Sequence, residues 1–274
     1  MEIRYGGRYG NQLFGYFSAR LYCEKNGLNL LTKPPSLCLD ILPNRDYGKN
    51  PNNLRSIGIR DKSYHSTKEE ISFYGKGNYI WTGLHQYEDI YYNNRDQILS
   101  WIKSKSLSNK SKSFVIHIRI DDFISRERHL IISREYYKYC INKYGQNYEE
   151  IILVKEDSNK EYEINYMNYL MDYIKSINKI PIYNKNNVSD DFWTIANADT
   201  IISSNSTFCF WATFFSNGKI IAFPYCGIDI LPGKKIKDWR NLALFYQKEF
   251  NSNIIIDKNF SENIIDYFDN VWNE

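Results

Sequence analysis

Short apolar runs alternate with amphipathic stretches along the second half of the chain. Runs rich in β-branched and aromatic residues predict buried strands at 114–119, 151–154, 180–183, 200–203 and 219–223. The stretches between them predict helices at 133–144, 159–177, from Ser189 onward, and at 205–216. A strand near 253–257 and a helix at 260–272 follow. This alternation predicts an α/β fold with a doubly wound parallel sheet.

The first half of the chain has fewer predicted elements. They are strands at 1–5, 28–32 and 79–82, a helix from Asn11, its N-cap, to Asn26 with Gly27 as C-cap, and a helix at 88–105. The irregular stretch 33–78 is typical of a functional or partner-facing loop.

A small, polar and charged segment at 104–113 predicts a linker between two domains. We place the domains at 1–108 and 109–274, and leave open that the last helix packs back on the first domain.

The composition narrows the class of protein. A net charge of +3 is too small to indicate nucleic-acid binding, and no apolar run reaches the length of a membrane span. The five scattered cysteines show no C-x-x-C spacing, which favours a reducing compartment over disulfides or zinc. No leader segment is evident at the N-terminus. We therefore expect a cytoplasmic protein, with peripheral contact to a membrane left open and its oligomeric state unknown.

The most informative chemistry follows the strand at 114–119. His117, Arg119, Asp121 and Asp122 come together at its carboxyl end, which is where open α/β sheets bind ligands. A guanidinium at this place is well shaped for a phosphate. The alternative is an ordinary charged turn after a core strand.

Other stretches have both a functional and a structural interpretation. The glycine-rich turn at 6–12 is either a phosphate cradle or a tight turn before a helix. The hydroxyl-rich stretch 203–207 either binds phosphate or caps the next helix. Ser189 is the expected N-cap of a helix with Asp190 and Asp191 in its first turn. A second group either lines a sugar site or packs in the core: Trp81, His85, Gln86 and Tyr87. The aromatic residues near 208–215 are assigned to the core: Phe208, Phe210, Trp211, Phe214 and Phe215.

Five blocks, in order, resemble glycosyltransferase family 11, the α-1,2-fucosyltransferases. Gly-Gly-Arg-Tyr-Gly-Asn-Gln-Leu-Phe at 6–14 is similar to the family's N-terminal signature, and Thr82–Gln86 to its Gly-Tyr-x-Gln segment. His117–Phe123 resembles the His-x-Arg-Arg-Gly-Asp-Tyr box, Asp191–Trp193 the Asp-Leu-Trp segment, and Ile202–Trp211 the Ala-Asn-Ser-Ser-Phe-Ser-Trp-Trp segment.

The resemblance implies a GT-B fold, in which two Rossmann-like domains face each other across a cleft. It implies an inverting glycosyltransferase that needs no metal or other cofactor and moves L-fucose from GDP-fucose to a glycan, on a galactose 2-hydroxyl. A GDP-sugar and a glycan acceptor are its implied partners. By the same resemblance, the donor-binding residues are His117 and Asp191 for guanine, Arg119 with Ser206 and Thr207 for the diphosphate, and Arg8, Gly10 and Asn11 from the first domain.

The general base is the least constrained role. Asp122 matches the family's box and is our first choice, with Asp121 and Glu127 as alternatives, and the leaving phosphate as a fourth. An ion pair of Asp122 with Arg119 is the structural alternative.

The chain departs from the box at two positions. Ile120 stands where the box has its second arginine, and Asp121 stands where it has glycine. These changes leave open a different nucleotide-sugar donor, or a protein that binds a nucleotide or glycan without catalysis.

Overall fold

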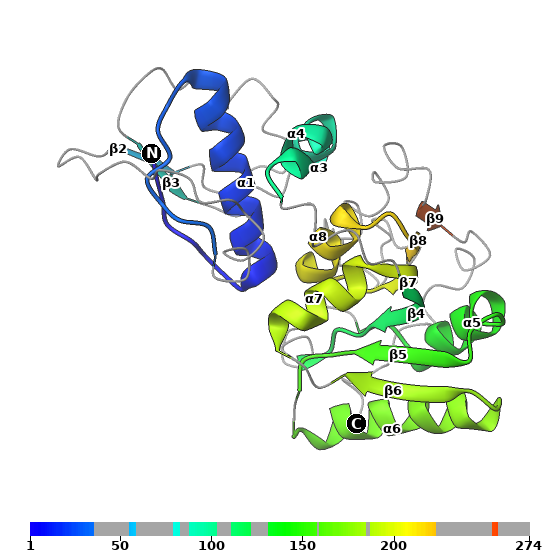
Figure 1. Ribbon diagram of the computed structural model, residues 1–274. Helices are drawn as coiled ribbons and strands as arrows, with labels where there is room; N and C mark the ends of the chain where they lie inside the picture. Colours follow the sequence, from blue (N-terminus) through cyan, green and yellow to red (C-terminus); the bar gives the residue numbers. More distant parts are fainter. Residues whose placement is uncertain are drawn as a thin grey trace, which may run out of the picture. The chain divides into compact units, whose positions relative to one another are not determined.

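The computed structural model describes residues 1–35, 55–58, 79–82, 88–102, 111–121, 131–157, 159–184, 187–222 and 254–256. The chain divides into two compact units, Met1–Ser104 and Lys105–Glu274 (Figure 1). The predicted boundary at 108/109 lies outside the described residues and stays a prediction. Each unit has its own parallel sheet, so the predicted α/β class with parallel sheets is confirmed.

The first unit is a small parallel sheet with helices. Strands β1 (Glu2–Ile3) and β2 (Arg55–Gly58) both pair with β3 (Tyr79–Thr82), in the order β1-β3-β2. Helix α1 (Tyr9–Asn26) follows β1 and ends at Gly27, whose left-handed φ of 63° confirms its predicted C-cap role. Trp81 belongs to the core, because its side chain is 1% exposed and its indole N–H donates to Ser18 Oγ at 2.8 Å.

Two predicted elements of the first unit are wrong. Residues 28–32 form no strand, because they make isolated contacts with β1 instead of a ladder; Ile3 N–H, for example, donates to the side chain of Thr32. The helix predicted at 88–105 is split into α3 (Glu88–Asn93) and α4 (Arg95–Ser100). Asn94 separates them, and its side-chain amide donates back to Ile90 O at 2.7 Å, a local bond that competes with helix continuation.

The second unit follows the predicted alternation of strands and helices. Its strands are β4 (Ser111–His117), β5 (Glu150–Val154), β6 (Ile180–Asn184), β7 (Ala198–Ser203), β8 (Lys219–Ala222) and β9 (Ile254–Ile256). The helices are α5 (Arg134–Tyr144), α6 (Glu161–Ser176), α7 (Val188–Ala196) and α8 (Thr207–Phe215). The helix predicted at 260–272 lies outside the described residues.

The strand order β6-β5-β4-β7-β8-β9 fixes where a ligand can bind. All five pairings are parallel, and the chain winds outward from β4 first through β5 and β6, then through β7 to β9 (Figure 1). Numbered from β4, this is the 3-2-1-4-5-6 order of dinucleotide-binding folds. The strand order reverses between β4 and β7, and the crevice outside their carboxyl ends is the expected ligand site.

Strand β4 separates two helical layers by the alternation of its side chains. Phe114, Ile116 and Ile118 join a buried cluster with residues of α5 and α6. His117 is one residue out of phase, and its ring lies 5.9 Å from that of Phe208 on α8. Successive side chains of a strand point to opposite faces, so His117 belongs to the layer of α7 and α8.

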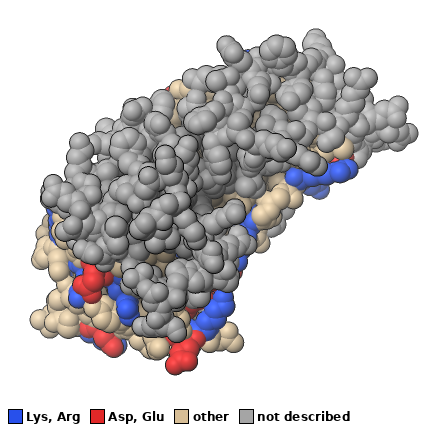
Figure 2. Space-filling model, turned by 180° about the vertical axis from the view of Figure 1, so that it is seen from behind, with Lys and Arg blue, Asp and Glu red and all other residues tan. Residues whose placement is uncertain are grey.

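The described surface has charges of both signs. On the face shown in Figure 2, lysine and arginine side chains lie beside aspartate and glutamate, as the small net charge of +3 leads one to expect. None of the helices in the described residues combines the length and apolar character needed to cross a membrane.

Candidate functional site

The centre of the site is a histidine–serine contact across the point where the strand order reverses. His117 ends β4, and Ser204 directly follows β7. Nδ1 of His117 lies 2.6 Å from Oγ of Ser204, and both residues are buried. Burial, with a smaller contribution from the Arg119 charge, lowers the pKa of His117 to about 3. His117 is therefore a neutral imidazole held by the adjoining strand.

Arg119 lies two residues beyond the end of β4. Its side chain is 14% exposed, and its guanidinium forms ion pairs at 3.3 Å with Oε2 of Glu156 and at 3.9 Å with Oδ2 of Asp121. Glu156 comes just after β5, the neighbouring strand. The predicted cation is thus at the carboxyl edge of the sheet, where carboxylates balance its positive charge.

Asp121 contacts two cations, Arg119 and Lys160, and has an unusual backbone conformation. Its φ of 25° lies in the left-handed region, which favours glycine. Lys160 Nζ is 3.2 Å from its Oδ1 and 3.4 Å from its carbonyl oxygen. The structure therefore places Asp121 between two cations, Arg119 and Lys160. The other two candidate bases, Asp122 and Glu127, lie outside the described residues.

Asp191 is a buried carboxylic acid near the start of α7. The predicted N-cap Ser189 is wrong: Asn187 caps this helix by accepting a hydrogen bond from Asp190 N–H at 3.0 Å, which leaves Ser189 inside the first turn. Asp191 is 8% exposed, and its Oδ1 has no hydrogen-bond partner among the described residues. Burial, followed by the charge of Asp190, raises its pKa to about 7. A ligand with N–H donors would satisfy this oxygen.

Ser206 and Thr207 lie at the N-terminus of α8. Ser206 Oγ accepts a hydrogen bond from Phe208 N–H at 3.2 Å, so it is the helix cap, and Thr207 is the first helical residue. The capping interpretation of this stretch is confirmed, and phosphate binding by the two hydroxyls is untested. Four of the aromatic residues that follow are buried in the core as predicted: Phe210, Trp211, Phe214 and Phe215. Phe208 is only half-buried, and its ring lies 5.9 Å from that of His117.

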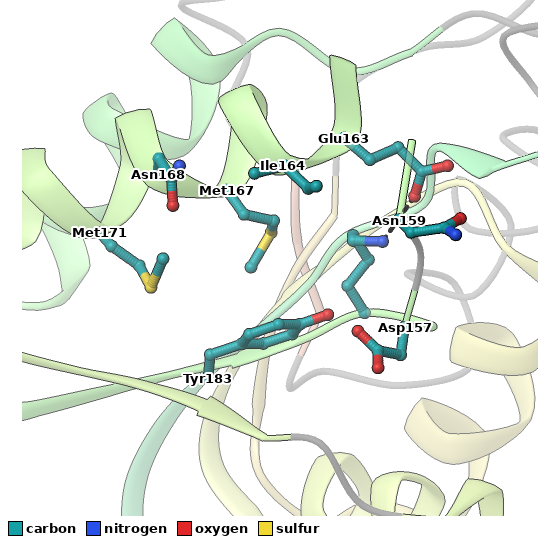
Figure 3. Close-up of a pocket in the computed structure, with 9 residues that line it drawn as sticks. Asp157, Asn159, Glu163, Ile164, Met167, Asn168, Met171 and Tyr183 are labelled. Carbon is teal, nitrogen blue, oxygen red and sulfur yellow. Dashed lines mark hydrogen bonds and ion pairs between the residues drawn. The ribbon is translucent and has the colours of Figure 1, made fainter. Parts of the chain in front are cut away.

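A hollow of about 750 Å³ lies beside this edge of the sheet, between α6 and β6. Asp157 and Asn159 line the end next to the β5–α6 loop, while Met167 and Met171 extend from α6 toward Tyr183 on β6 (Figure 3). Burial, with Asp157 as the second cause, raises the pKa of Tyr183 to about 12. The hollow therefore combines hydrogen-bond acceptors with a soft, apolar wall.

A buried ion pair lines the same hollow. Lys155 Nζ lies 2.5 Å from Oε2 of Glu163, with the two side chains 4% and 0% exposed. The second oxygen of Glu163, Oε1, accepts no hydrogen bond among the described residues and lies 3.8 Å from Lys160 Nζ. The sequence analysis missed these residues. The charged run Lys155-Glu156-Asp157 directly after a buried strand could have indicated a nucleotide site, because an acid at the end of the second strand binds ribose in dinucleotide-binding folds.

The glycine-rich turn at 6–12 belongs to the first unit and lies within the described residues. Arg8 is exposed, and Gly10 is buried in the first turn of α1. Asn11 is not the N-cap as predicted: the helix begins at Tyr9 with Arg8 at the cap position. Asn11 instead folds over Gly7, whose φ is 71° and where an added Cβ would lie 2.4 Å from Asn11 Nδ2. The predicted sugar-site residues His85, Gln86 and Tyr87 lie outside the described residues.

The described residues include no group of three or more His, Cys, Asp or Glu side chains arranged to hold a metal ion. The expectation of a reaction without a metal stays a prediction.

Comparison with known proteins gives one family. The sequence pattern of glycosyl transferase family 11 matches residues 52–226, more than half of the chain. This span contains the histidine–arginine strand end, Asp191 and the start of α8, whereas the glycine-rich turn precedes it. No curated protein and no solved structure matches the chain.

Proposed function

The chain belongs to glycosyl transferase family 11, and on that premise we propose that it transfers L-fucose from GDP-fucose to a glycan hydroxyl. The acceptor we propose is the 2-hydroxyl of galactose, with inversion at the fucose anomeric carbon and without a metal ion. The two units would be the two domains of a GT-B enzyme. The enzyme would act in the cytoplasm, on glycans at a membrane surface.

The observation that carries the proposal is the position of Arg119 at the edge of a 3-2-1-4-5-6 sheet where the strand order reverses. Such a position favours a nucleotide diphosphate. As the sugar leaves, negative charge grows on the departing GDP, and a preorganised guanidinium stabilises that charge in the transition state. Ser206 and Thr207 would add hydroxyl donors at the N-terminus of α8.

The preference for guanine is proposed from Asp191. Guanine carries two adjacent N–H donor groups on one edge, and a carboxylate can accept from both. The Oδ1 of Asp191, buried and without a hydrogen bond among the described residues, suits that edge. Uracil has no such pair of donors. His117, which is neutral, would complete the base site, since a neutral imidazole avoids placing a second positive charge beside Arg119.

The remaining roles follow from the family resemblance. Arg8, Gly10 and Asn11 of the first unit would face the diphosphate and the fucose. Asp122 would accept the proton from the acceptor hydroxyl, with Glu127, Asp121 or the leaving phosphate as the alternative base.

A second hypothesis is that the protein uses another nucleotide-sugar as donor, or binds one without turnover. It is favoured by Asp121, because its carboxylate adds negative charge beside Arg119 where an incoming diphosphate would bind.

The test is transfer from GDP-fucose to a galactoside, measured as GDP release and as the fucosylated product, with and without EDTA. We expect EDTA to leave the rate unchanged. Arg119→Ala should lower kcat about 10²- to 10³-fold, as loss of one oxyanion-type donor does. Arg134→Ala is the matched control and should leave kcat unchanged, because this arginine of α5 lies over the ring of Tyr169. Turnover of a uridine-linked sugar in place of GDP-fucose would overturn the donor assignment.

A further inference from the structure

A carboxylate lies between two cations at the strand end that carries Arg119. Asp121 is 3.9 Å from the guanidinium of Arg119 on one side and 3.2 Å from the ammonium of Lys160 on the other. The residue between Arg119 and Asp121 is Ile120, whose side chain is buried and apolar. The strand end itself therefore supplies one cation, and a second comes from a distant part of the chain.

The position of Lys160 is fixed by the fold. It is the residue before the first turn of α6, so its backbone is anchored to a helix of 16 residues. Its side chain is 51% exposed, and its ammonium group reaches back to both the carboxylate and the carbonyl oxygen of Asp121. Glu163 is another acid near Lys160, but it lies 3.8 Å away and is bound more closely by the buried Lys155.

The backbone at Asp121 is in the left-handed region. An aspartate at a φ of 25° costs free energy that a glycine would not, and the cost must be offset by the surroundings. Its ion pairs with Arg119 and Lys160 are among the contacts made by this residue. An ion pair as exposed as that of Lys160 contributes little to folding stability, so a ligand can replace it at small cost.

We propose that Lys160 is a second cation for the donor's diphosphate, and that the Asp121 carboxylate holds its place between Arg119 and Lys160 until the diphosphate displaces it. A diphosphate carries more than one negative charge and has oxygens enough to contact both cations. Asp121 is then a positioning residue that keeps the two cations together and competes with the ligand. This inference rests on the proposed function for its ligand, a nucleoside diphosphate.

The test uses inorganic pyrophosphate and GDP as separate probes, titrated calorimetrically into the full chain at one fixed ionic strength. Lys160→Ala should weaken the binding of both about tenfold, the size of one lost charge-assisted hydrogen bond. Lys175→Ala is the matched control, because this lysine also pairs with an acid on α6 (Asp172, at 3.6 Å) but lies at the other end of the helix. Asp121→Asn should strengthen the binding of both probes several-fold, since the competing charge is removed.

Guanosine, which has no phosphate, should bind the wild type and Lys160→Ala equally. The proposal is overturned if Lys160→Ala binds pyrophosphate as Lys175→Ala does, or if Asp121→Asn binds it more weakly than the wild type. Pyrophosphate separates this inference from the donor assignment, because it has no base. If Lys160→Ala weakens pyrophosphate binding but the wild type does not prefer GDP to other nucleoside diphosphates, the proposed donor alone is contradicted.

Discussion

The imidazole Nδ1 of His117 lies 2.6 Å from the hydroxyl oxygen of Ser204, which joins β4 to β7 at the edge where the strand order reverses. The contact is buried, and the histidine is neutral because burial lowers its pKa to about 3. It therefore fixes the strand end from which Arg119 extends.

The first prediction concerns acid stability. Between pH 6.5 and about 3 the unfolded chain binds a proton at this histidine that the folded chain does not, so the free energy of unfolding falls as the pH falls through this range. His117→Asn should remove the contribution of this histidine to the slope of the free energy of unfolding against pH. The measurement is urea unfolding of both proteins at several values between pH 7 and 4.5. Ser206→Ala, which loses a helix cap, should destabilise by about 1 kcal/mol without changing the slope. Parallel curves for wild type and His117→Asn would contradict a buried neutral histidine.

The second prediction concerns Asp191, whose shift has the opposite sign. Its pKa is raised from 3.8 to about 7, so between these values the folded chain binds the proton that the unfolded chain has released. This group therefore makes the free energy of unfolding fall as the pH rises from about 4 to 7. Asp191→Asn should remove this slope, whereas the exposed Asp172→Asn should retain it. GDP affinity in the wild type should rise through pH 7 as Asp191 ionises, and a pH-independent affinity would contradict its role as the guanine acceptor.

The third prediction tests the buried pair of Lys155 and Glu163. Glu163→Gln should destabilise by about 3–5 kcal/mol, because it leaves the Lys155 ammonium buried without its counter-charge. Replacing both residues, Lys155→Met with Glu163→Leu, should cost much less. The control is Glu135→Gln in the exposed pair with Lys138, which should cost at most about 1 kcal/mol. The free energy of unfolding of each variant is measured by chemical denaturation. An equal loss in Glu163→Gln and Glu135→Gln would contradict a buried ion pair between Lys155 and Glu163.

The fourth prediction compares two adjacent glycines. Gly7→Ala should destabilise the first unit by about 1–3 kcal/mol, since its φ is 71° and the new methyl would collide with Asn11. Gly6→Ala is the matched control: an added Cβ there has nothing within 4 Å. Thermal unfolding of both variants gives the comparison, and similar melting temperatures would show that the turn does not need glycine at position 7.

The sequence predicted the second unit better than the first. Buried parallel strands are continuous apolar runs, so β4, β5 and β7 were recognisable from residues such as Phe114, Ile151 and Ile201 alone. The charged residues after β4 were recognisable for the same reason, since they interrupt such a run. In the first unit, the helix is broken at Asn94 beside a local side-chain hydrogen bond that hydrophobic periodicity does not report.

The helix starts at Asn11 and Ser189 were predicted wrongly, and the ion pairs between distant residues were not predicted. Both Asn11 and Ser189 are good capping residues, but the helices begin earlier, at Tyr9 and Val188, with Arg8 and Asn187 at the cap positions. Pairing between distant charges was also beyond the sequence. Nothing local to Lys160 indicates that it reaches Asp121, because the contact depends on how β5 and α6 are placed relative to the end of β4.

We propose that the second unit binds a guanine nucleotide at the edge that carries Arg119 and Asp191. The most direct measurement is the melting temperature of the purified protein titrated with GDP, UDP, ADP and CMP. A ligand at 100 times its Kd stabilises the folded state by about 2.7 kcal/mol, which raises the melting temperature measurably. We predict a rise with GDP alone that is lost in Arg119→Ala. A rise with UDP and none with GDP would contradict guanine recognition by Asp191.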